Sequence, residues 1–552
     1  MKVCALLCLS SFILLRTGQA EERPMVDTKY GKLRGVIEPL KETPRTADAF
    51  YGIPFAKPPV GPLRFANPEL PKPWESIRDA SQYPPMCLQH VEIMEGIASY
   101  YKSPFKMPPL SEDCLYLNIF TPSDRDKKSK LPVMFFIHGG GLLVAGASLF
   151  DCSALSVYEN VVVVSIQYRL GILGFFSTGD DELPGNLGFL DQVAALHWVQ
   201  ENIAEFGGDQ HSVTIFGESA GGVSVSALVL SPLTKGLFHK AIAESGTVAM
   251  PGMAVSKPEE LTFYRDVVSE VSGCDVSSVV ECLKRKSEKE ILSATEKLGF
   301  LPLPICVDGV FLPKPVEEIL ANKESNRVPL LLGVCNHEFG WMLPQIFNLT
   351  EITEGMNREL VRRALHKLPI LGLSSAVLPS ALDEYLSDVS DPFSFRDRFL
   401  DICGDVLFIV PTRRVANYHR DSGLPVYFYE YQHRPSLFDG VRPDFVKADH
   451  VDEIVYVFGG PFLRDGVLFA GHATDEEKAL SRTIMRYWAN FARNGNPNGP
   501  GQVEWPLYDK KEQYLEINLK QKASARLKED KFNFWSKILS RRVEEGGEHI
   551  EL

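Results

Sequence analysis

Residues 212–228 read SVTIFGESAGGVSVSAL and join a strand pattern directly to a helix pattern. Residues 213–216 are β-branched or aromatic, which favours a buried strand. Residues 220–228 are small or apolar and uncharged, as in a core helix. The pentapeptide Gly-Glu-Ser-Ala-Gly at 217–221 therefore predicts a sharp turn from a strand into a helix.

Ser219 lies at the centre of this turn and is the candidate nucleophile. The chain comes close to itself two residues before and two residues after the serine, where Gly217 and Gly221 have no side chain to obstruct it. The following helix directs its free N–H groups at negative charge beside Ser219. G-x-S-x-G also arises by chance, and Ser219 is then only a helix N-cap. Glu218 is favourable in a first helical turn whatever the function.

The composition is that of an ordinary soluble globular protein. The 552 residues are 45% hydrophobic and 23% charged, which is enough to bury a large core. No internal repeat or low-complexity linker divides the chain, so residues 21–548 are expected to form one large domain. The net charge of −13 opposes a nucleic-acid partner, because phosphate binding depends on clustered Lys and Arg.

Both ends of the chain carry targeting patterns. Residues 1–20 combine Lys2 with an apolar run that is too short to span a bilayer, as in a cleaved secretory signal peptide. The last four residues, His-Ile-Glu-Leu at 549–552, resemble the signals read by a retention receptor, with a chance match as the alternative. Together the two ends predict residence in the lumen of the endoplasmic reticulum.

Buried strands alternate with helical patterns before the central stretch. Residues 131–137 read as a strand that runs into the glycine loop 138–141, and a membrane helix here is rejected because His138 and several glycines interrupt the apolar run. A second strand at 161–168 and a helix at 190–206 follow. This alternation predicts a parallel α/β sheet, with ligands at the carboxyl ends of its strands.

Further elements are expected after the central stretch. Strands are predicted at 238–244, 328–334 and 425–431, and a long helix runs from Asp475 to Arg493 before Asn494-Gly495. The chain after this helix is mostly polar.

Eight cysteines follow the signal: Cys87, Cys114, Cys152, Cys274, Cys282, Cys306, Cys335 and Cys403. An oxidising compartment favours disulfides, but the sequence alone does not choose the pairs, and free buried thiols are an equally ordinary state. Asn348-Leu349-Thr350 is the one N-glycosylation sequon and fits the same secretory route.

A serine hydroxyl needs a general base, and the base needs an acid to orient it. In the order serine, acid, histidine, the base lies late in the chain. The candidates are His366, His419, His433, His450 and His472.

Several long motifs in one order decide between them. The chain resembles the type-B carboxylesterases, closest to the vertebrate endoplasmic-reticulum carboxylesterases, across nearly its whole length. The motifs that carry this resemblance are YGIPFAKPPVGPLRF at 51–65, SEDCLYLNIF at 111–120, HGGG at 138–141, QYRLGILGFF at 167–176, FGESAGG at 216–222, NHEFGW at 336–341 and DHVDEI at 449–454.

The resemblance implies an α/β-hydrolase fold with a central, mostly parallel sheet, flanking helices and large insertions. It assigns Glu338 as the acid and His450 as the base; without it, these are equally a solvated loop carboxylate and a surface histidine. It assigns Gly140, Gly141 and the N–H of Ala220 as the oxyanion hole, which a Cβ on the loop would obstruct.

The resemblance also implies the disulfides Cys87–Cys114 and Cys274–Cys282, with the other four cysteines free. Residues 88–113 contain no Trp, unlike the cholinesterases of this superfamily, which disfavours choline selectivity. The glycine loop is no phosphate-binding loop, because no Lys follows it, and His337-Glu338 lacks the spacing of a zinc motif. No metal or cofactor is expected.

The expected function is therefore cleavage of uncharged carboxylic esters as small-molecule substrates, with amides and thioesters as further substrates, by a serine hydrolase of broad specificity for xenobiotic and lipid esters. Two alternatives stand beside it. One is an adhesion module of the neuroligin kind, which lacks the nucleophile and carries a transmembrane helix. The other is a secreted lipase of the bile-salt type, against which the 549–552 tail argues. The acyl or alcohol preference and the oligomeric state are not predicted.

Overall fold

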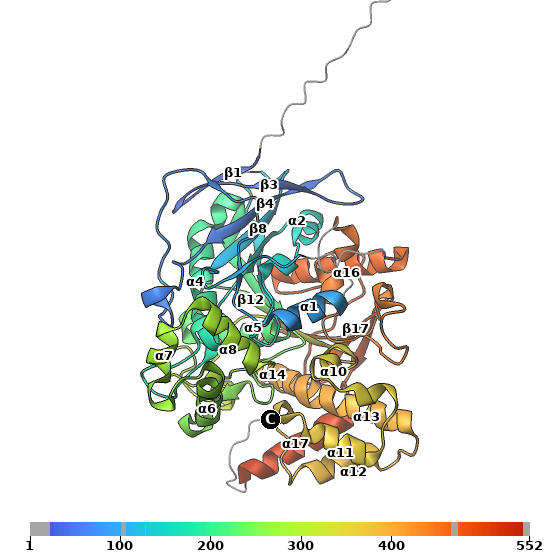
Figure 1. Cartoon of the computed structure of the whole chain (residues 1–552). Helices are drawn as coiled ribbons and strands as arrows, with labels where there is room; N and C mark the ends of the chain where they lie inside the picture. The colour runs from blue at the N-terminus through green and yellow to red at the C-terminus, as the bar shows by residue number, and fades with distance from the viewer. Residues whose placement is uncertain (1–22, 101–105, 127, 465–472, 545–552) are drawn as a thin grey trace, which may run out of the picture.

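The computed structural model describes residues 23–100, 106–126, 128–464 and 473–544 (Figure 1). The predicted signal peptide at 1–20 and the predicted retention sequence at 549–552 lie outside the described residues.

An 11-stranded sheet forms the centre of the described structure. The seven strands from β10 to β17 in spatial order are mutually parallel, whereas β18, β8, β4 and β3 join antiparallel at the two edges. In spatial order the strands are β18 (Lys522–Ala525), β17 (Gln513–Ile517), β16 (Val426–Tyr431), β15 (Leu330–Cys335), β12 (Lys240–Glu244), β11 (Gly208–Glu218), β9 (Leu131–Ile137), β10 (Val162–Ile166), β8 (Tyr116–Pro122), β4 (Thr46–Pro54) and β3 (Val36–Pro39).

Shorter strands form small sheets outside this one. They are β1 (Met25–Thr28), β2 (Gly31–Arg34) and β5 (Arg78–Asp79); β6 (Met86–Cys87) and β7 (Leu110–Ser111); and β13 (Ala254–Val255) and β14 (Ile305–Cys306).

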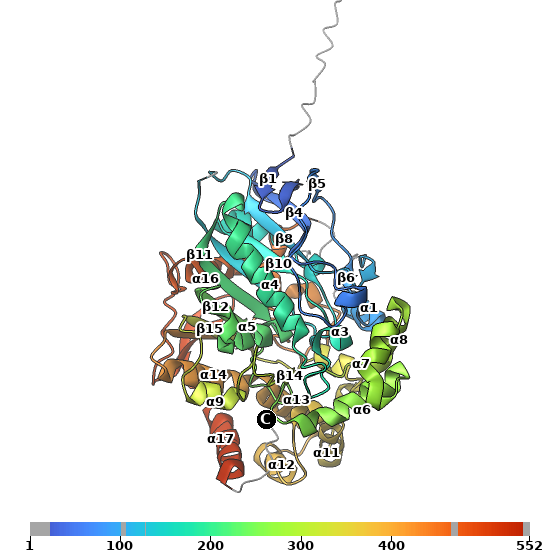
Figure 2. The same cartoon turned by 90° about the vertical axis from the view of Figure 1, so that its left-hand side faces the viewer.

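Helices cover both faces of the large sheet. In Figure 1 the sheet lies between α4 on the left and α16 on the right, and Figure 2 shows α4 and α5 crossing the face turned toward the viewer. Helix α9 contacts both α5 and α14 and so extends this layer, and α2 packs with α16 on the other face. The helices are α1 (Val91–Tyr100), α2 (Ser153–Glu159), α3 (Gly171–Phe175), α4 (Leu187–Asn202), α5 (Ala220–Leu230), α6 (Leu261–Ser272), α7 (Val279–Arg285), α8 (Glu288–Leu298), α9 (Val316–Ala321), α10 (Met342–Ile346), α11 (Arg358–His366), α12 (Leu378–Leu386), α13 (Pro392–Gly404), α14 (Val410–Asp421), α15 (Ile454–Val457), α16 (Asp475–Asn494) and α17 (Glu529–Glu544).

This arrangement confirms the predicted α/β-hydrolase fold class. β9 has the predicted bounds, and β10, β12, β15 and β16 lie within one or two residues of theirs. Helix α16 ends at Asn494, and Gly495 caps it with φ 70°, a left-handed conformation that glycine adopts without strain. The 131–150 run contains a buried strand rather than a membrane helix. Within the described ranges, no helix has the length and apolarity needed to cross a membrane.

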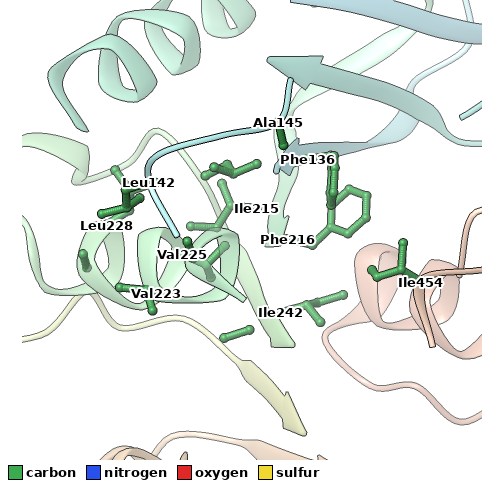
Figure 3. Close-up of a cluster of buried hydrophobic side chains, with 14 of the residues drawn as sticks. Phe136, Leu142, Ala145, Ile215, Phe216, Val223, Val225, Leu228, Ile242 and Ile454 are labelled. Atoms are coloured by element: carbon green, nitrogen blue, oxygen red, sulfur yellow. The ribbon is translucent and has the colours of Figure 1, made fainter. Parts of the chain in front are cut away.

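The core is continuous on both sides of the strand that precedes Ser219. Figure 3 shows Phe216 of β11 beside Phe136 of β9, whereas Ile215 of β11 lies on the other side of the strand, toward Val223 and Val225 of α5. These side chains are fully buried or nearly so. A strand buried on both faces explains the continuous apolar run in the sequence, without alternation of polar residues.

The sequence did not predict the edges of the sheet or the last helix. The polar tail after Asn494 contains β17, β18 and α17. The buried residues in this segment include Tyr514, Leu515 and Trp535, but most of the residues around them are polar. The local composition therefore does not reveal the apolar positions of these strands and this helix.

Two disulfides join the cysteine pairs that the resemblance implied, Cys87 with Cys114 and Cys274 with Cys282. The first closes a loop that contains α1. The remaining cysteines are free and buried: Cys152, Cys306, Cys335 and Cys403.

Candidate active site

Ser219 occupies the turn between β11 and α5 with φ 59° and ψ −125°. Non-glycine residues rarely adopt this backbone conformation, and its cost is of the order of 1–3 kcal/mol. The surrounding turn holds it: an added Cβ on Gly217 would lie 2.7 Å from the backbone of Gly221, and one on Gly221 would lie 2.1 Å from the carbonyl oxygen of Ile137. Glycine is therefore required at both positions for steric reasons.

The structure brings Ser219, His450 and Glu338 together from three distant parts of the chain. The distance from Ser219 Oγ to His450 Nε2 is 2.8 Å, and from His450 Nδ1 to Glu338 Oε2 it is 2.6 Å. Glu338 follows β15, and His450 lies in the loop between β16 and α15. Because β11, β15 and β16 are parallel, these loops all leave the same edge of the sheet.

The other oxygen of Glu338 is also fixed. Oε1 accepts the backbone N–H of Cys335 at 2.6 Å, so the carboxylate is held by its own loop while Oε2 faces the imidazole. Both side chains are buried. A buried carboxylate orients the imidazole and selects its tautomer, with the proton on Nδ1 and the lone pair of Nε2 toward Ser219.

The glycine loop passes beside Ser219. Gly140 and Gly141 have φ of 95° and 65°, and both line the same cavity as Ser219 and His450. Ala220 is the first residue of α5, so its N–H has no partner within the helix. His138, which precedes the glycines, is buried and stacked on Tyr168, and burial lowers its pKa to about 4.

A second carboxylate, Glu218, contacts the imidazole at Nε2, the ring nitrogen away from Glu338. Glu218 Oε1 lies 3.2 Å from His450 Nε2, and its side chain is almost fully buried. Burial raises the pKa of Glu218 well above its usual range, although His450 opposes this. Burial also disfavours the charged form of His450, but Glu218 and Glu338 outweigh it and raise the pKa of the imidazole to about 9.

Two further carboxylates are buried behind these residues. Glu453 accepts hydrogen bonds from Ser245 Oγ and Tyr429 Oη, each at 3.1 Å, and Cys335 Sγ lies 3.1 Å from its other oxygen. Glu244 accepts from the Trp488 indole at 3.1 Å. Burial raises the pKa of both carboxyls. The residues behind the site therefore form a buried network of polar side chains rather than an apolar core.

A cavity of about 630 Å³, its open mouth included, contains Ser219 and His450. Among the described residues that line it, Glu218 is the one carboxylate and none is Lys or Arg. The apolar lining consists of Met94, Ile97, Val144, Ala145, Leu149, Phe150, Phe300, Met342, Leu343, Ile346 and Val451. Such a lining favours uncharged, apolar groups.

Three of the four competing histidines lie elsewhere. His419 contacts the carbonyl oxygen of Val328, His433 contacts Glu477 at 3.0 Å, and His366 ends α11. His472 lies outside the described residues. Among the described residues, no cluster of three or more His, Cys, Asp or Glu side chains could hold a metal ion.

Sequence reasoning missed the contacts of Glu218 and Glu453. The sequence indicates Glu218 only as a carboxylate in a first helical turn, and it gives Glu453 no role beyond its place in the motif DHVDEI. Their proximity to the imidazole depends on how β11 and the loop after β16 meet, and no local pattern encodes that.

Comparison with known proteins agrees with this site. The sequence profile described as "Carboxylesterase family" matches residues 22–535. The chain is 51% identical over 534 residues to a medium-chain fatty acyl-CoA hydrolase precursor of Anas platyrhynchos, covering 95% of this chain and 94% of the relative.

Two other relatives cover nearly the full length. Liver carboxylesterase 1 of Mus musculus is 45% identical over 574 residues, with 100% of each chain covered. Cocaine esterase of Homo sapiens is 45% identical over 550 residues, covering 99% of this chain and 97% of the relative. The chain belongs to the carboxylesterase family and is an ester-hydrolysing enzyme with the α/β-hydrolase fold.

Proposed function

We propose that this enzyme cleaves carboxylic esters through an acyl-enzyme formed on Ser219, with His450 as general base and acid and Glu338 as the orienting carboxylate. The observation that carries the proposal is the pair of contacts at His450: 2.8 Å to Ser219 Oγ and 2.6 Å to Glu338 Oε2, at the wall of an apolar cavity. The adhesion-module alternative is disfavoured, because such modules lack the nucleophile, whereas Ser219 is present and contacts His450.

In the first half-reaction Ser219 Oγ attacks the ester carbonyl carbon while its proton passes to His450 Nε2. The carbonyl oxygen takes the negative charge of a tetrahedral intermediate. When the intermediate collapses, the C–O bond to the alcohol breaks, and the imidazolium gives its proton to the departing alkoxide. The acyl group is left on Ser219.

In the second half-reaction His450 Nε2 takes a proton from water, whose oxygen attacks the acyl carbon. The second tetrahedral intermediate collapses, the bond to Ser219 Oγ breaks, and that oxygen recovers the proton from the imidazolium. The products are a carboxylic acid and free enzyme. Glu338 stabilises the imidazolium in both halves.

Backbone N–H groups of Gly140, Gly141 and Ala220 bind the oxyanion in this proposal. Support comes from the position of the two glycines at the cavity wall and from the free N–H of Ala220 at the start of α5. Donors that are already in place stabilise developing charge without reorganisation, which is worth about 10²–10³ in kcat for a single donor.

The substrates are esters whose acyl and alcohol parts are uncharged and apolar, including xenobiotic and lipid esters. The apolar lining, which has no Lys or Arg among its described residues, supports this choice. Thioesters belong to the range because the relative from Anas platyrhynchos is named as an acyl-CoA hydrolase, and amides follow from the same acyl-transfer chemistry.

A fluorophosphonate probe tests the mechanism. The probe should label Ser219, as mapped by peptide mass, and Ser219→Ala should lose both labelling and ester turnover. Ser226→Ala is the matched control, since Ser226 is a buried serine farther along α5. Labelling at another residue, or burst kinetics in Ser219→Ala with an activated ester, would refute the proposal.

We propose that residues 21–548 form one catalytic domain, that 1–20 is cleaved on entry to the endoplasmic reticulum, and that 549–552 retains the enzyme there. One buried cluster that runs from Val26 to Trp535 supports a single domain. Asn348 is exposed and is the proposed glycosylation site.

Deleting residues 549–552 should move active enzyme into the medium. If the full chain is exported as efficiently as the shortened one, the secreted-lipase alternative is favoured.

A further inference from the structure

The helical stretch from α13 to α14 changes its winding beside the proposed catalytic residues. α13 ends at Gly404, a π-helical turn follows at Asp405–Ile409, and α14 begins at Val410. We call Asp405–Ile409 the π-turn. Pro411 lies just beyond it, and in a regular helix its ring would clash with the carbonyl four residues earlier. π-turns inside helices are frequent at functional sites.

The π-turn and the residue before it lie against His450 and Glu338. The ring of Phe408 is 4.6 Å from the ring of His450 at an interplanar angle of 45°. Gly404, directly before the π-turn, faces the acid: an added Cβ would lie 3.6 Å from Glu338 Cβ, in ordinary contact. Phe408 is buried and is not one of the residues that line the cavity, so it contacts the imidazole rather than the substrate.

The first residue of the π-turn is held by an ion pair. Asp405 is buried, and its two oxygens accept from Lys528 Nζ and Tyr385 Oη, both at 2.7 Å. Lys528 Nζ also lies 3.0 Å from Asp401. Burial raises the pKa of Asp405, whereas Lys528 opposes that rise. A buried carboxylate left without this cation would carry an uncompensated charge.

The ammonium group comes from the other end of the chain. The carbonyl of Lys528 accepts the N–H of Phe532 at 2.9 Å, which places Lys528 at the start of α17. Trp535 of α17 donates to Tyr385 Oη at 3.0 Å. The C-terminal helix is thereby connected to Asp405 along two routes, one ionic and one through the tyrosine hydroxyl.

We propose that Phe408 is a positioning residue for His450, and that the Lys528–Asp405 ion pair holds the π-turn that carries it. The inference rests on the proposed role of His450 in catalysis. Without Phe408 the imidazole gains freedom to tilt out of line with Ser219 Oγ and Glu338, and small misplacements of a reacting group cost large factors in rate.

Phe408→Leu tests the aromatic contact, with kcat, KM and the pH dependence of kcat/KM measured on an uncharged ester. The expected result is a fall of about 10-fold in kcat with KM within about 2-fold of the wild type. The charged groups that face the imidazole are Glu218, Glu338 and Glu453. A tilted ring loses part of their influence, so the apparent pKa should move toward the ordinary imidazole value.

Phe189→Leu is the matched control for this variant. Phe189 is fully buried and packs against Phe175 and Phe311, away from the cavity lining. It should lose stability to a similar degree without a change in the apparent pKa.

Lys528→Met tests the ion pair. It should lower kcat several-fold with little change in KM. The double variant Lys528→Met/Asp405→Asn should recover most of the loss, because residue 405 then carries no charge and the partly exposed Asp401 keeps Arg398 at 3.6 Å. Lys531→Met is the matched control: Lys531 lies one turn further along α17 and binds Glu384 at 2.8 Å. It should retain wild-type kcat.

The inference is wrong if Phe408→Leu keeps the wild-type kcat and pH profile, or if Lys528→Met loses no more activity than Lys531→Met. Should Lys528→Met fail to fold, Phe408→Leu alone decides the outcome. His450→Gln separates this inference from the proposed function. An inactive His450→Gln beside an unaffected Phe408→Leu refutes only the positioning role, whereas an active His450→Gln refutes the catalytic assignment itself.

Discussion

The carboxylate of Asp449 accepts the backbone N–H of Met342 at 2.8 Å. Its other oxygen accepts the N–H groups of Gly340 and Trp341 at 3.0 and 3.1 Å. The residue next to His450 therefore ties down the loop that follows Glu338. One side chain sets the spacing between the two loops that supply the proposed acid and base.

Asp449→Ala should lower kcat by about 10-fold to 10²-fold, because a released loop displaces Glu338 from the imidazole. It should also destabilise the fold, since buried N–H groups without an acceptor cost about 1–3 kcal/mol each. Steady-state kinetics and thermal melting measure both effects. Asp308→Ala is the control: its carboxylate binds the N–H groups of Val310 and Leu312 away from the site. If both variants lose only stability, Asp449 has no role in aligning the site.

Glu218 should shift the pH dependence of kcat/KM. Activity rises as His450 loses its proton, and the raised pKa of the imidazole, about 9, moves that rise to higher pH than an isolated histidine would give. A negative charge favours the protonated ring, so Glu218→Gln should shift the rising limb of kcat/KM to lower pH, by about one unit or more.

Glu244→Gln is the control for this shift. Glu244 is another buried carboxyl with a raised pKa, but it binds Trp488 rather than the imidazole. Its profile should keep the wild-type midpoint. A profile of Glu218→Gln that also keeps the wild-type midpoint would rule out the coupling between Glu218 and His450.

Gly141→Ala should reduce kcat by about 10²-fold or more while Ser219 still reacts slowly with an organophosphate. Gly141 has φ 65°, which strains any other residue, and an added Cβ would lie 2.9 Å from Phe300 Cζ, so either the proposed oxyanion loop or the Phe300 ring must shift. Gly309→Ala separates strain from position: Gly309 has φ 72° with nothing within 4 Å of the added Cβ. Comparable losses of kcat in the two variants would argue against an oxyanion role.

Loss of the Cys87–Cys114 bond should lower the melting temperature and weaken substrate binding together. Chain-entropy arguments give about 3.5 kcal/mol for a loop of this length, and about 2.5 kcal/mol for the shorter Cys274–Cys282 loop. The first loop also carries Met94 and Ile97 of α1, which line the cavity. KM should therefore rise in the double Ala variant of the first pair only, as measured by melting and kinetics. An unchanged KM would show that α1 keeps its place without the bond.

The sheet was predictable where its strands are buried on both faces. The apolar runs within β9, β11 and β15 are short, so hydrophobicity alone marks them, although β11 itself begins earlier, at Gly208, with polar residues that the prediction left out. The antiparallel strands β4 and β8 were not predicted. β17 and β18 mix polar with apolar residues, and α17 buries only one side. Their sequences are therefore too polar on average to indicate buried elements.

The site was predictable to the extent that long motifs carried it. The turn at Ser219 follows from the steric needs of Gly217 and Gly221, whereas Glu338 and His450 depended on the family resemblance. Phe408 and Lys528 had no signal, because their relation to His450 exists only after α13, α14 and α17 have packed.

The separation of Ser219 from His450 along the chain has a consequence for biosynthesis. The two residues are 231 positions apart, so the turn that exposes the serine is translated well before its base. At roughly 5–20 residues per second the interval is on the order of 10–50 s. The growing chain therefore holds a shaped but unactivated hydroxyl until the proposed base His450 has been added, and esterase activity reports that synthesis has reached the last fifth of the protein.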